Sequence, residues 1–162
     1  MTDKLSFLGI DPGLRRTGWA IIRKDKTCLK YIASGVIQPR YTIQSIAYQL
    51  IDIFNGICHV ISQYEPSYVA IENTYVNENP ASSLKLAQAR SAAIIASAKY
   101  GLIPSEYQAS TIKKTVSGNG NADKEQLYKM ITLQLGFIKC KTNDESDAIA
   151  IAICDTLFQK LV

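Results

Sequence analysis

The stretch GIDPGLRRTGWA, residues 9–20, decides the fold. An apolar run over residues 5–10 ends in Asp11, and Pro12-Gly13 then breaks the chain. Asp, Pro and Gly all favour turns, so Asp11 could simply begin a turn. A strand tip is also a rigid position for a metal-binding or catalytic oxygen. Whether other carboxylates reach the same place decides between the two interpretations.

Short apolar segments around this stretch predict three strands close together in the sequence, which favours an antiparallel meander. Helical and strand-like patterns then alternate, which predicts a mixed sheet with helices on its faces. The expected strands cover residues 5–10, 18–23, 28–37, 68–72 and 103–107. The expected helices cover residues 42–64, 81–100, 110–116, 122–135 and about 144 to the C-terminus. Asn121 is the expected N-cap of the fourth helix.

Length and composition describe an ordinary globular protein. The chain has 162 residues, about the size of one domain, and we expect a single domain over residues 1–162. Its content of 47% hydrophobic and 20% charged residues is typical of soluble proteins. No apolar run approaches the roughly 18 residues of a membrane span. The N-terminus has no signal-peptide pattern, so we expect a cytoplasmic protein with no membrane association.

The cysteines and the histidine exclude the usual zinc sites. The four cysteines are far apart, with no C-x-x-C pair, and His59 is the one histidine. His59 lies within a helical pattern, where packing or surface exposure is more common than catalysis. Lys and Arg outnumber Asp and Glu by 18 to 14, and the resulting net charge of +4 is compatible with a polyanionic partner.

Three further carboxylates are candidates to join Asp11. Glu72 ends the strand 68–72 as Asp11 ends the first, and parallel neighbours would bring both to the same sheet edge, where sites collect. Asp144 and Asp147 are three residues apart on a predicted helix, so they share a face. Acidic residues also favour the first turn of any helix, which is the plain alternative for this pair.

Assembled without a counter-charge, these acids would repel one another strongly. Mg²⁺ or Mn²⁺ is the natural counter-charge, because hard cations prefer carboxylate oxygens to imidazole or thiolate. An all-oxygen metal site in a basic protein suggests phosphoryl chemistry. In two-metal hydrolysis, ions about 3.5–4 Å apart activate the attacking water and stabilise the leaving oxygen.

The predicted helix 81–100 is rich in alanine and serine, which lets another backbone approach closely. That backbone could belong to the same chain or to a second subunit, and the sequence leaves both open.

Four blocks of the sequence resemble the RuvC family of bacterial Holliday junction resolvases, within the RNase H-like nuclease superfamily. They occur in the family's order and at family-like spacing over nearly the whole chain: LGIDPGLRRTGWAII, VAIENTYVNENPASSLKLAQARSAAI, IKKTVSGNGNADKEQ and DESDAIAIAICD. The resemblance implies an α/β, RNase H-like fold whose five-stranded sheet is antiparallel in its first three strands and then parallel, with helices on both faces. It also implies a homodimer that nicks two strands of a four-way junction symmetrically, and a branch-migration helicase complex as a possible partner.

The family's four catalytic, metal-binding acids fall on Asp11, Glu72, Asp144 and Asp147. The resemblance thus implies magnesium dependence, with Mn²⁺ as a plausible substitute and two ions per active site. We expect Asp11 to be the central ligand, because its position is the most rigid. Glu72 and Asp147 would complete the two ion sites, while Asp144 would either bind a metal or orient the attacking water.

The same resemblance places DNA contacts on basic and aromatic residues. Family basic positions map to Lys113 and Lys124, and a lysine early in a helix is best explained if it holds a phosphate together with the exposed N–H groups. Tyr75 stands where the family carries an aromatic side chain that stacks on a base, although it could be an ordinary loop tyrosine. Weaker candidates for backbone contacts are Lys114, Lys85, Arg90, Arg15 and Arg16.

Three other readings compete with the resolvase. Actin-like ATPases and sugar kinases share the opening hairpin, but they need two such domains. A RuvC-like nuclease could act on structured RNA, although the DESDAIAIA block and the lysine motifs favour the junction resolvase. A catalytically silent junction-binding protein is the third, and the presence of all four acids argues against it.

Overall fold

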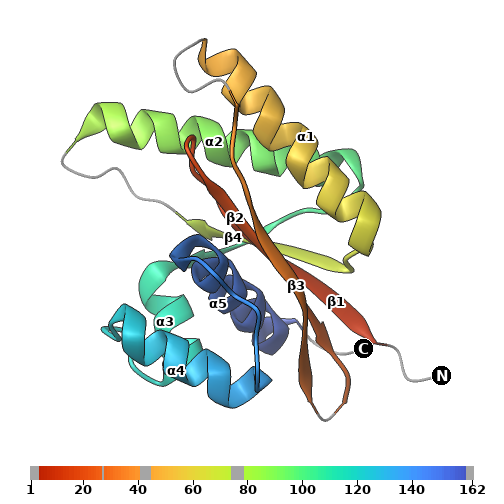
Figure 1. Ribbon diagram of the computed structural model, residues 1–162, viewed down its shortest axis with the longest axis vertical. Coiled ribbons are helices and arrows are strands. Elements are labelled where there is room, and N and C mark those ends of the chain that lie inside the picture. Colours follow the sequence, from red (N-terminus) through yellow and green to blue (C-terminus); the bar gives the residue numbers. More distant parts are fainter. Residues whose placement is uncertain (1–3, 27, 41–44, 74–78, 160–162) are drawn as a thin grey trace.

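A computed structural model describes residues 4–26, 28–40, 45–73 and 79–159. Its centre is a mixed sheet in the order β3-β2-β1-β4-β5. The first three strands are antiparallel, and β4 and β5 continue the sheet parallel to β1, which confirms the predicted arrangement (Figure 1). The strands are β1 (Leu5–Asp11), β2 (Thr17–Lys24), β3 (Leu29–Ile37), β4 (Tyr68–Asn73) and β5 (Ser105–Gln108).

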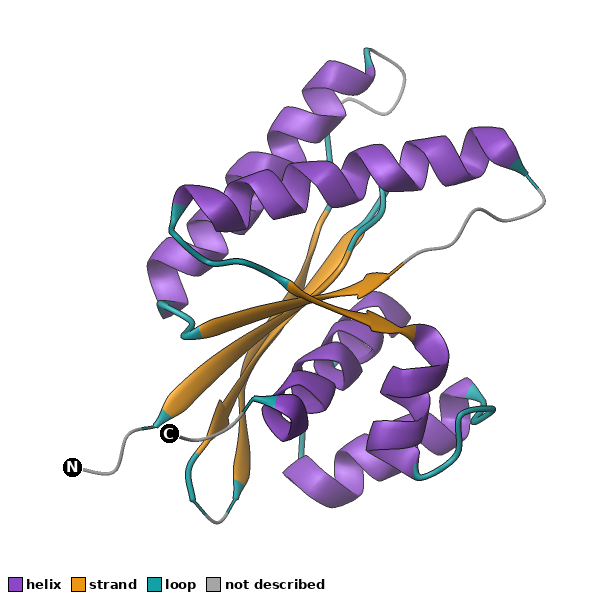
Figure 2. Cartoon of the chain, turned by 180° about the vertical axis from the view of Figure 1, so that it is seen from behind, coloured by secondary structure: helices purple, strands orange, loops and turns teal. Residues whose placement is uncertain are grey.

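Helices cover both faces of the sheet, as predicted. Helices α1 and α2 lie on one face and α3, α4 and α5 on the other (Figure 2). The helices are α1 (Ile46–Tyr64), α2 (Pro80–Lys99), α3 (Ala109–Ser117), α4 (Lys124–Leu135) and α5 (Asn143–Phe158). None of the helices in these described ranges is long and apolar enough to cross a membrane.

Strand β1 is central because its side chains are apolar on both faces. Phe7 belongs to the core beneath α3, α4 and α5, whereas Leu8 and Ile10 belong to the core beneath α1 and α2. All three side chains are fully buried. Successive side chains of a strand point to opposite faces, so a continuous apolar run is what a strand covered on both sides requires.

Helix α5 packs directly against β1 and β2, and two glycines permit this. A Cβ at Gly9 would collide with the backbone of Ala148, and a Cβ at Gly18 would collide with the backbone of Asp144. Residues 148–153 of α5 are fully or almost fully buried, so the helix is fixed over the sheet by packing along its length. The first turn of α5 is thereby held beside the β1–β2 connection.

Several element boundaries differ from the sequence prediction. Strand β5 begins at Ser105 rather than at 103, and Ile103 is 82% exposed ahead of Pro104, which cannot donate to a ladder. The N-cap of α4 is Asp123, not Asn121: Asp123 accepts a hydrogen bond from the backbone N–H of Gln126, whose side chain accepts one in return. Residues 42–44 of the first predicted helix lie outside the described residues.

The small residues of α2 pack within the chain. Ala89 and Ala92 lie against Ile53 of α1, and Ala93 and Ala96 belong to the core beneath both helices. Close intramolecular packing is therefore one confirmed use of this composition. A subunit contact on the opposite face of α2 stays a prediction.

Candidate active site

The strand-tip acids lie level with each other at one edge of the sheet. β1 and β4 are parallel neighbours whose last paired residues are Ile10 and Ile71. Asp11 and Glu72 follow these two residues directly, at the carboxyl ends of their strands. The expected juxtaposition is present because parallel neighbours end at the same sheet edge.

The helix acids reach the same edge from the first turns of α5. Gly18 pairs with Asp11 across the β1–β2 ladder, and its Cα faces the backbone of Asp144. Asp147 follows Asp144 by about one turn on the same helix face. The turn that leads into β2 is tied together by Thr17, whose hydroxyl donates to the carbonyl of Gly13 and accepts from its N–H.

Asp11 experiences the electrostatic field of the other three acids. Its pKa is raised from 3.8 to about 7, first by burial and then by the charges of Asp147, Glu72 and Asp144, while Lys124 opposes the shift. A carboxyl shifted in this way signals like charges gathered in a partly desolvated place. The structure therefore brings all four predicted acids into one electrostatic cluster.

Glu72 and Asp147 respond to the same cluster. Burial raises the pKa of Glu72, with a further increase from Asp147, and Lys113 and Lys124 lower it. Burial likewise raises the pKa of Asp147, against which the charge and hydrogen bond of Lys124 act. The two lysines that the sequence singled out thus lie at the acids. Glu72, Lys113, Lys124 and Asp147 line a shared cavity of about 220 Å³.

Two of the acids form ion pairs with basic residues. Nε of Arg16 lies 2.8 Å from Oδ2 of Asp144, and Nζ of Lys124 lies 3.6 Å from Oδ2 of Asp147. Across the described ranges, no three side chains of His, Cys, Asp or Glu are gathered closely enough to hold a metal ion. The donor set, four carboxylates with mutual repulsion, has the chemistry that a hard divalent cation requires. The helix carboxylates, however, are partnered by basic side chains.

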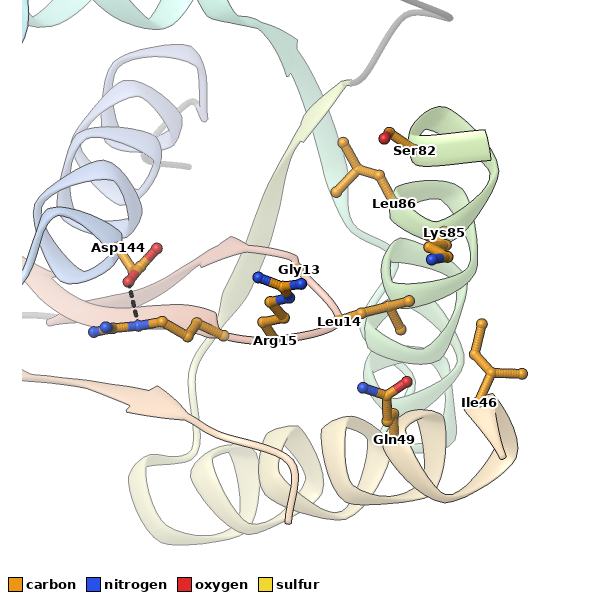
Figure 3. Close-up of a pocket in the computed structure, with 10 residues that line it drawn as sticks. Gly13, Leu14, Arg15, Ile46, Gln49, Ser82, Lys85, Leu86 and Asp144 are labelled. Carbon is orange, nitrogen blue, oxygen red and sulfur yellow. Dashed lines mark ion pairs between the residues drawn. The ribbon is translucent and has the colours of Figure 1, made fainter. Parts of the chain in front are cut away.

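A wide groove of about 1100 Å³ opens beside the acids, between the β1–β2 turn and the N-terminal parts of α1 and α2 (Figure 3). Arg15, Arg16 and Lys85 line it, and Asp144 is the one acidic residue among the described residues that line it. Leu14, Ile46 and Leu86 provide its apolar surface. A groove of this charge suits a polyanion that extends away from the acids.

The remaining predicted contact residues are dispersed. Lys114 is exposed on α3. Arg90 forms an ion pair with Glu106 of β5, with Nη2 2.5 Å from Oε2, and its side chain is only 19% exposed. Tyr75 lies outside the described residues. His59, for which the sequence predicts no catalytic role, is exposed on α1.

Two residues near the acids have roles that the sequence reading did not assign. Arg16, placed only among the weaker DNA contacts, is the ion-pair partner of Asp144. Glu145 turns away from the cluster and accepts hydrogen bonds from Ser34 and from the backbone N–H of Lys141. Burial alone would raise the pKa of Glu145, but these hydrogen bonds lower it overall. The spacing Thr142-x-x-Glu145 could have indicated this structural role, since the Thr142 hydroxyl caps α5.

Comparisons with known proteins agree with this geometry. The family model described as crossover junction endodeoxyribonuclease RuvC matches residues 7–155. RuvC of Rhodopseudomonas palustris (strain TIE-1) is 44% identical over 149 residues, 92% of this chain and 85% of its own length. RuvC of Rhodospirillum rubrum is 45% identical over 150 residues, covering 93% and 88% of the two chains.

Solved structures show the same fold. T. thermophilus RuvC in complex with a Holliday junction substrate superposes with a TM-score of 0.87 at 22% identity, covering 95% of this chain and 94% of that one. The match of the family model, the identity to the curated relatives and the four acids at one sheet edge lead to one conclusion: the chain belongs to the RuvC family of crossover junction endodeoxyribonucleases.

Proposed function

We propose that this chain is a divalent-metal-dependent endonuclease that resolves four-way DNA junctions by paired hydrolysis of phosphodiester bonds in recombination and repair. One observation carries the proposal: in a chain of this family, Asp11, Glu72, Asp144 and Asp147 lie in one electrostatic cluster at the carboxyl edge of the sheet. Such a cluster is costly to keep unless cations and a substrate make use of it.

The acids would hold Mg²⁺, with Mn²⁺ as a substitute, and two ions per site would suit four carboxylates. A bound divalent ion supplies Lewis-acid stabilisation of the phosphodiester and lowers the pKa of the attacking water. Asp11 is proposed as the central ligand because it experiences the charges of all three other acids and is fixed by the β1–β2 ladder. Glu72 and Asp147 would flank it, and Asp144 would either bind an ion or orient the attacking water.

The basic residues at the cluster would hold the strand to be cut. Lys113 and Lys124 line the cavity that contains Glu72 and Asp147, so a phosphate held there lies next to the acids. Lys124 is the first residue of α4, whose exposed N–H groups favour an anion.

Lys85 and Arg15 in the wide groove and Lys114 on α3 would contact the DNA backbone further out. Arg90 would do so only after leaving Glu106, and Tyr75 is proposed to stack on a base near the crossover.

A homodimer would present two such sites to the two like-polarity strands of a junction. Helix α2 leaves Leu84 and Ile95 60% or more exposed, and a second copy could cover these apolar side chains. A branch-migration helicase is the further partner proposed from the family resemblance.

The decisive experiment incubates the protein with Mg²⁺ and end-labelled substrates: a four-way DNA junction, a linear duplex with the same arm sequence, and a four-way RNA junction. We expect symmetric nicks in the DNA junction that ligase can seal, and intact linear duplex. Equal cleavage of duplex and junction would contradict the proposal. Preferential cleavage of the RNA junction would indicate an RNA-processing nuclease, and binding of the DNA junction without nicks would indicate a silent binding protein.

A further inference from the structure

Arg16 provides a cation inside the acid cluster. Its Nε lies 2.8 Å from Oδ2 of Asp144, a charge-assisted hydrogen bond of ordinary length. A guanidinium stays charged at every relevant pH, so this pair cannot be released by losing a proton. The positive charge of Arg16 at this oxygen opposes the approach of a second cation and occupies one of the lone pairs that could bind it.

The pair is placed so that such a movement is possible. The Arg16 side chain is 46% exposed and that of Asp144 is 30% exposed, so the contact is wet and weak rather than locked in the core. Arg16 and Asp144 both line the wide groove, and in Figure 3 Asp144 lies on the opposite side of it from Lys85 of α2. A side chain at this position can turn from the carboxylate to a ligand in the groove without disturbing the fold.

A DNA phosphodiester bound in the groove would compete with Asp144 for Arg16. Arg15 and Lys85 line the groove with Arg16, so among the described lining residues three positive charges face the one negative charge of Asp144. In Figure 3, Arg15 and Lys85 extend from opposite walls, the β1–β2 turn and α2. Arg16 lines the same groove, so a phosphodiester bound there enters the cavity that Arg16 faces. Arginine binds phosphate at least as well as it binds carboxylate, because its planar donors fit both groups.

We propose that Arg16 exchanges partners: it holds Asp144 in the free protein and turns to a phosphodiester of the DNA when a strand enters the groove, which releases Asp144 for the divalent cation. This inference rests on the proposed function. Arg16 acts through Asp144 and is a positioning residue. Its effect is to couple DNA binding to metal binding. A bound phosphodiester draws Arg16 away from Asp144, which favours the cation, and a bound cation displaces Arg16 from Asp144, which favours the phosphodiester. Such coupling is reciprocal, so the metal raises the affinity for junction by the same factor as the junction raises the affinity for metal.

The test measures metal binding without DNA, where activity plays no part. Mn²⁺ binding to the full chain is followed by electron paramagnetic resonance in wild type, Arg16→Gln and the matched control Arg15→Gln. Arg15 carries the same charge in the same turn, but it is Arg16 that contacts Asp144. We expect Arg16→Gln to bind Mn²⁺ about two- to fivefold more tightly, the range of an exposed ion pair, and Arg15→Gln to match wild type. Arg16→Lys keeps the charge without the Nε donor and should fall between wild type and Arg16→Gln.

A second measurement tests the DNA side of the exchange. Junction affinity is measured in EDTA over a series of salt concentrations. Arg16→Gln should reduce the slope of log K against log salt by about one, as expected when one phosphate contact is lost. An unchanged or weaker Mn²⁺ affinity of Arg16→Gln, or an unchanged salt slope, would overturn the exchange even if wild type cleaves junctions normally. Failure of wild type to prefer junctions over duplex would instead contradict the proposed function.

Discussion

The two ends of α5 each place carboxylates in a desolvated environment, and the two outcomes differ. At the N-terminal end, the acids face one another, and burial, followed by the like charges of the other acids, raises the pKa of Asp11 to about 7. At the C-terminal end, Asp155 is fully buried and its pKa is also raised by burial, but hydrogen bonds from Tyr107 and Gln159 oppose the shift. The Tyr107 hydroxyl donates to Oδ1 of Asp155 over 2.7 Å.

The difference shows that burial of a carboxylate does not by itself indicate a site. Oδ1 of Asp155 accepts hydrogen bonds from Tyr107 and Gln159, and the bond from Tyr107 ties α5 to β5. This carboxylate therefore stabilises the fold. Asp11 has like charges where Asp155 has donors. Acids whose like charges face one another, and whose ion-pair partners Arg16 and Lys124 are 46% and 70% exposed, are arranged for cations that come from outside.

The largest effect should come from removing the central acid. Asp11→Asn takes away the oxygen charge on which the proposed metal site depends, which corresponds to several kcal/mol of transition-state stabilisation. We expect junction cleavage in Mg²⁺ to fall at least about a hundredfold, with junction binding in EDTA retained. Asp155→Asn is the matched acid-to-amide control at the other end of the helix, and its folded fraction should cleave at the wild-type rate. Full cleavage by Asp11→Asn would remove the distinction between the two ends.

The stability of the metal-free protein should fall as pH rises from about 4 to 7. In this window the folded protein keeps a proton on Asp11 that the unfolded chain has released. The pKa of Asp11 is about 7 in the folded protein, whereas the unfolded chain has the ordinary value of 3.8. The unfolded state therefore binds fewer protons, and the free energy of unfolding decreases with pH. The loss could reach about 4 kcal/mol, since a tenfold change in proton binding corresponds to about 1.4 kcal/mol.

Urea unfolding in EDTA at pH 5 and pH 8 measures the part of this loss above pH 5, about 3 kcal/mol, and Asp11→Asn is the control that should reduce it. Raised pKa values of Glu72, Asp147 and Asp155 should leave part of the slope in that variant. A wild-type protein more stable at pH 8 than at pH 5 would contradict the raised pKa of Asp11.

The opposite end of α5 should affect stability and leave chemistry unchanged. Asp155→Ala leaves the Tyr107 hydroxyl without its acceptor, which should cost about 1–3 kcal/mol of unfolding free energy. Asp155→Asn keeps an acceptor oxygen and should cost less. Cleavage per folded molecule should stay at the wild-type level in both variants. A selective loss of cleavage in a fully folded Asp155→Ala protein would mean that the C-terminal end also serves the site.

The smallest effect concerns the lysines beside the acids. Lys113→Ala and Lys124→Ala should each weaken junction binding and reduce its salt slope by about one, with no change of sequence preference. Lys129→Ala, on the same helix as Lys124 but paired with Glu125, serves as the control and should keep the wild-type slope. An unchanged slope in Lys113→Ala and Lys124→Ala would place the DNA elsewhere.

The sequence by itself determined the order of elements, the strand-tip positions of Asp11 and Glu72 and the helical spacing of Asp144 and Asp147. These are local properties, since apolar periodicity and turn chemistry act over a few residues. It failed at the α4 cap, where Asn121 and Asp123 are both good capping residues, and only the reciprocal bond of Gln126 selects Asp123. It also failed at the start of β5, where pairing with β4 begins after Pro104.

Only the tertiary structure decided which charges face each other. Gly9 and Gly18 let α5 approach β1 and β2, and this approach brings acids more than 130 positions apart in sequence into one field. The same approach selects Arg16 rather than Arg15 as the partner of Asp144 and turns Glu145 toward Ser34. Coulomb interactions depend on distance in space, which a one-dimensional pattern does not contain.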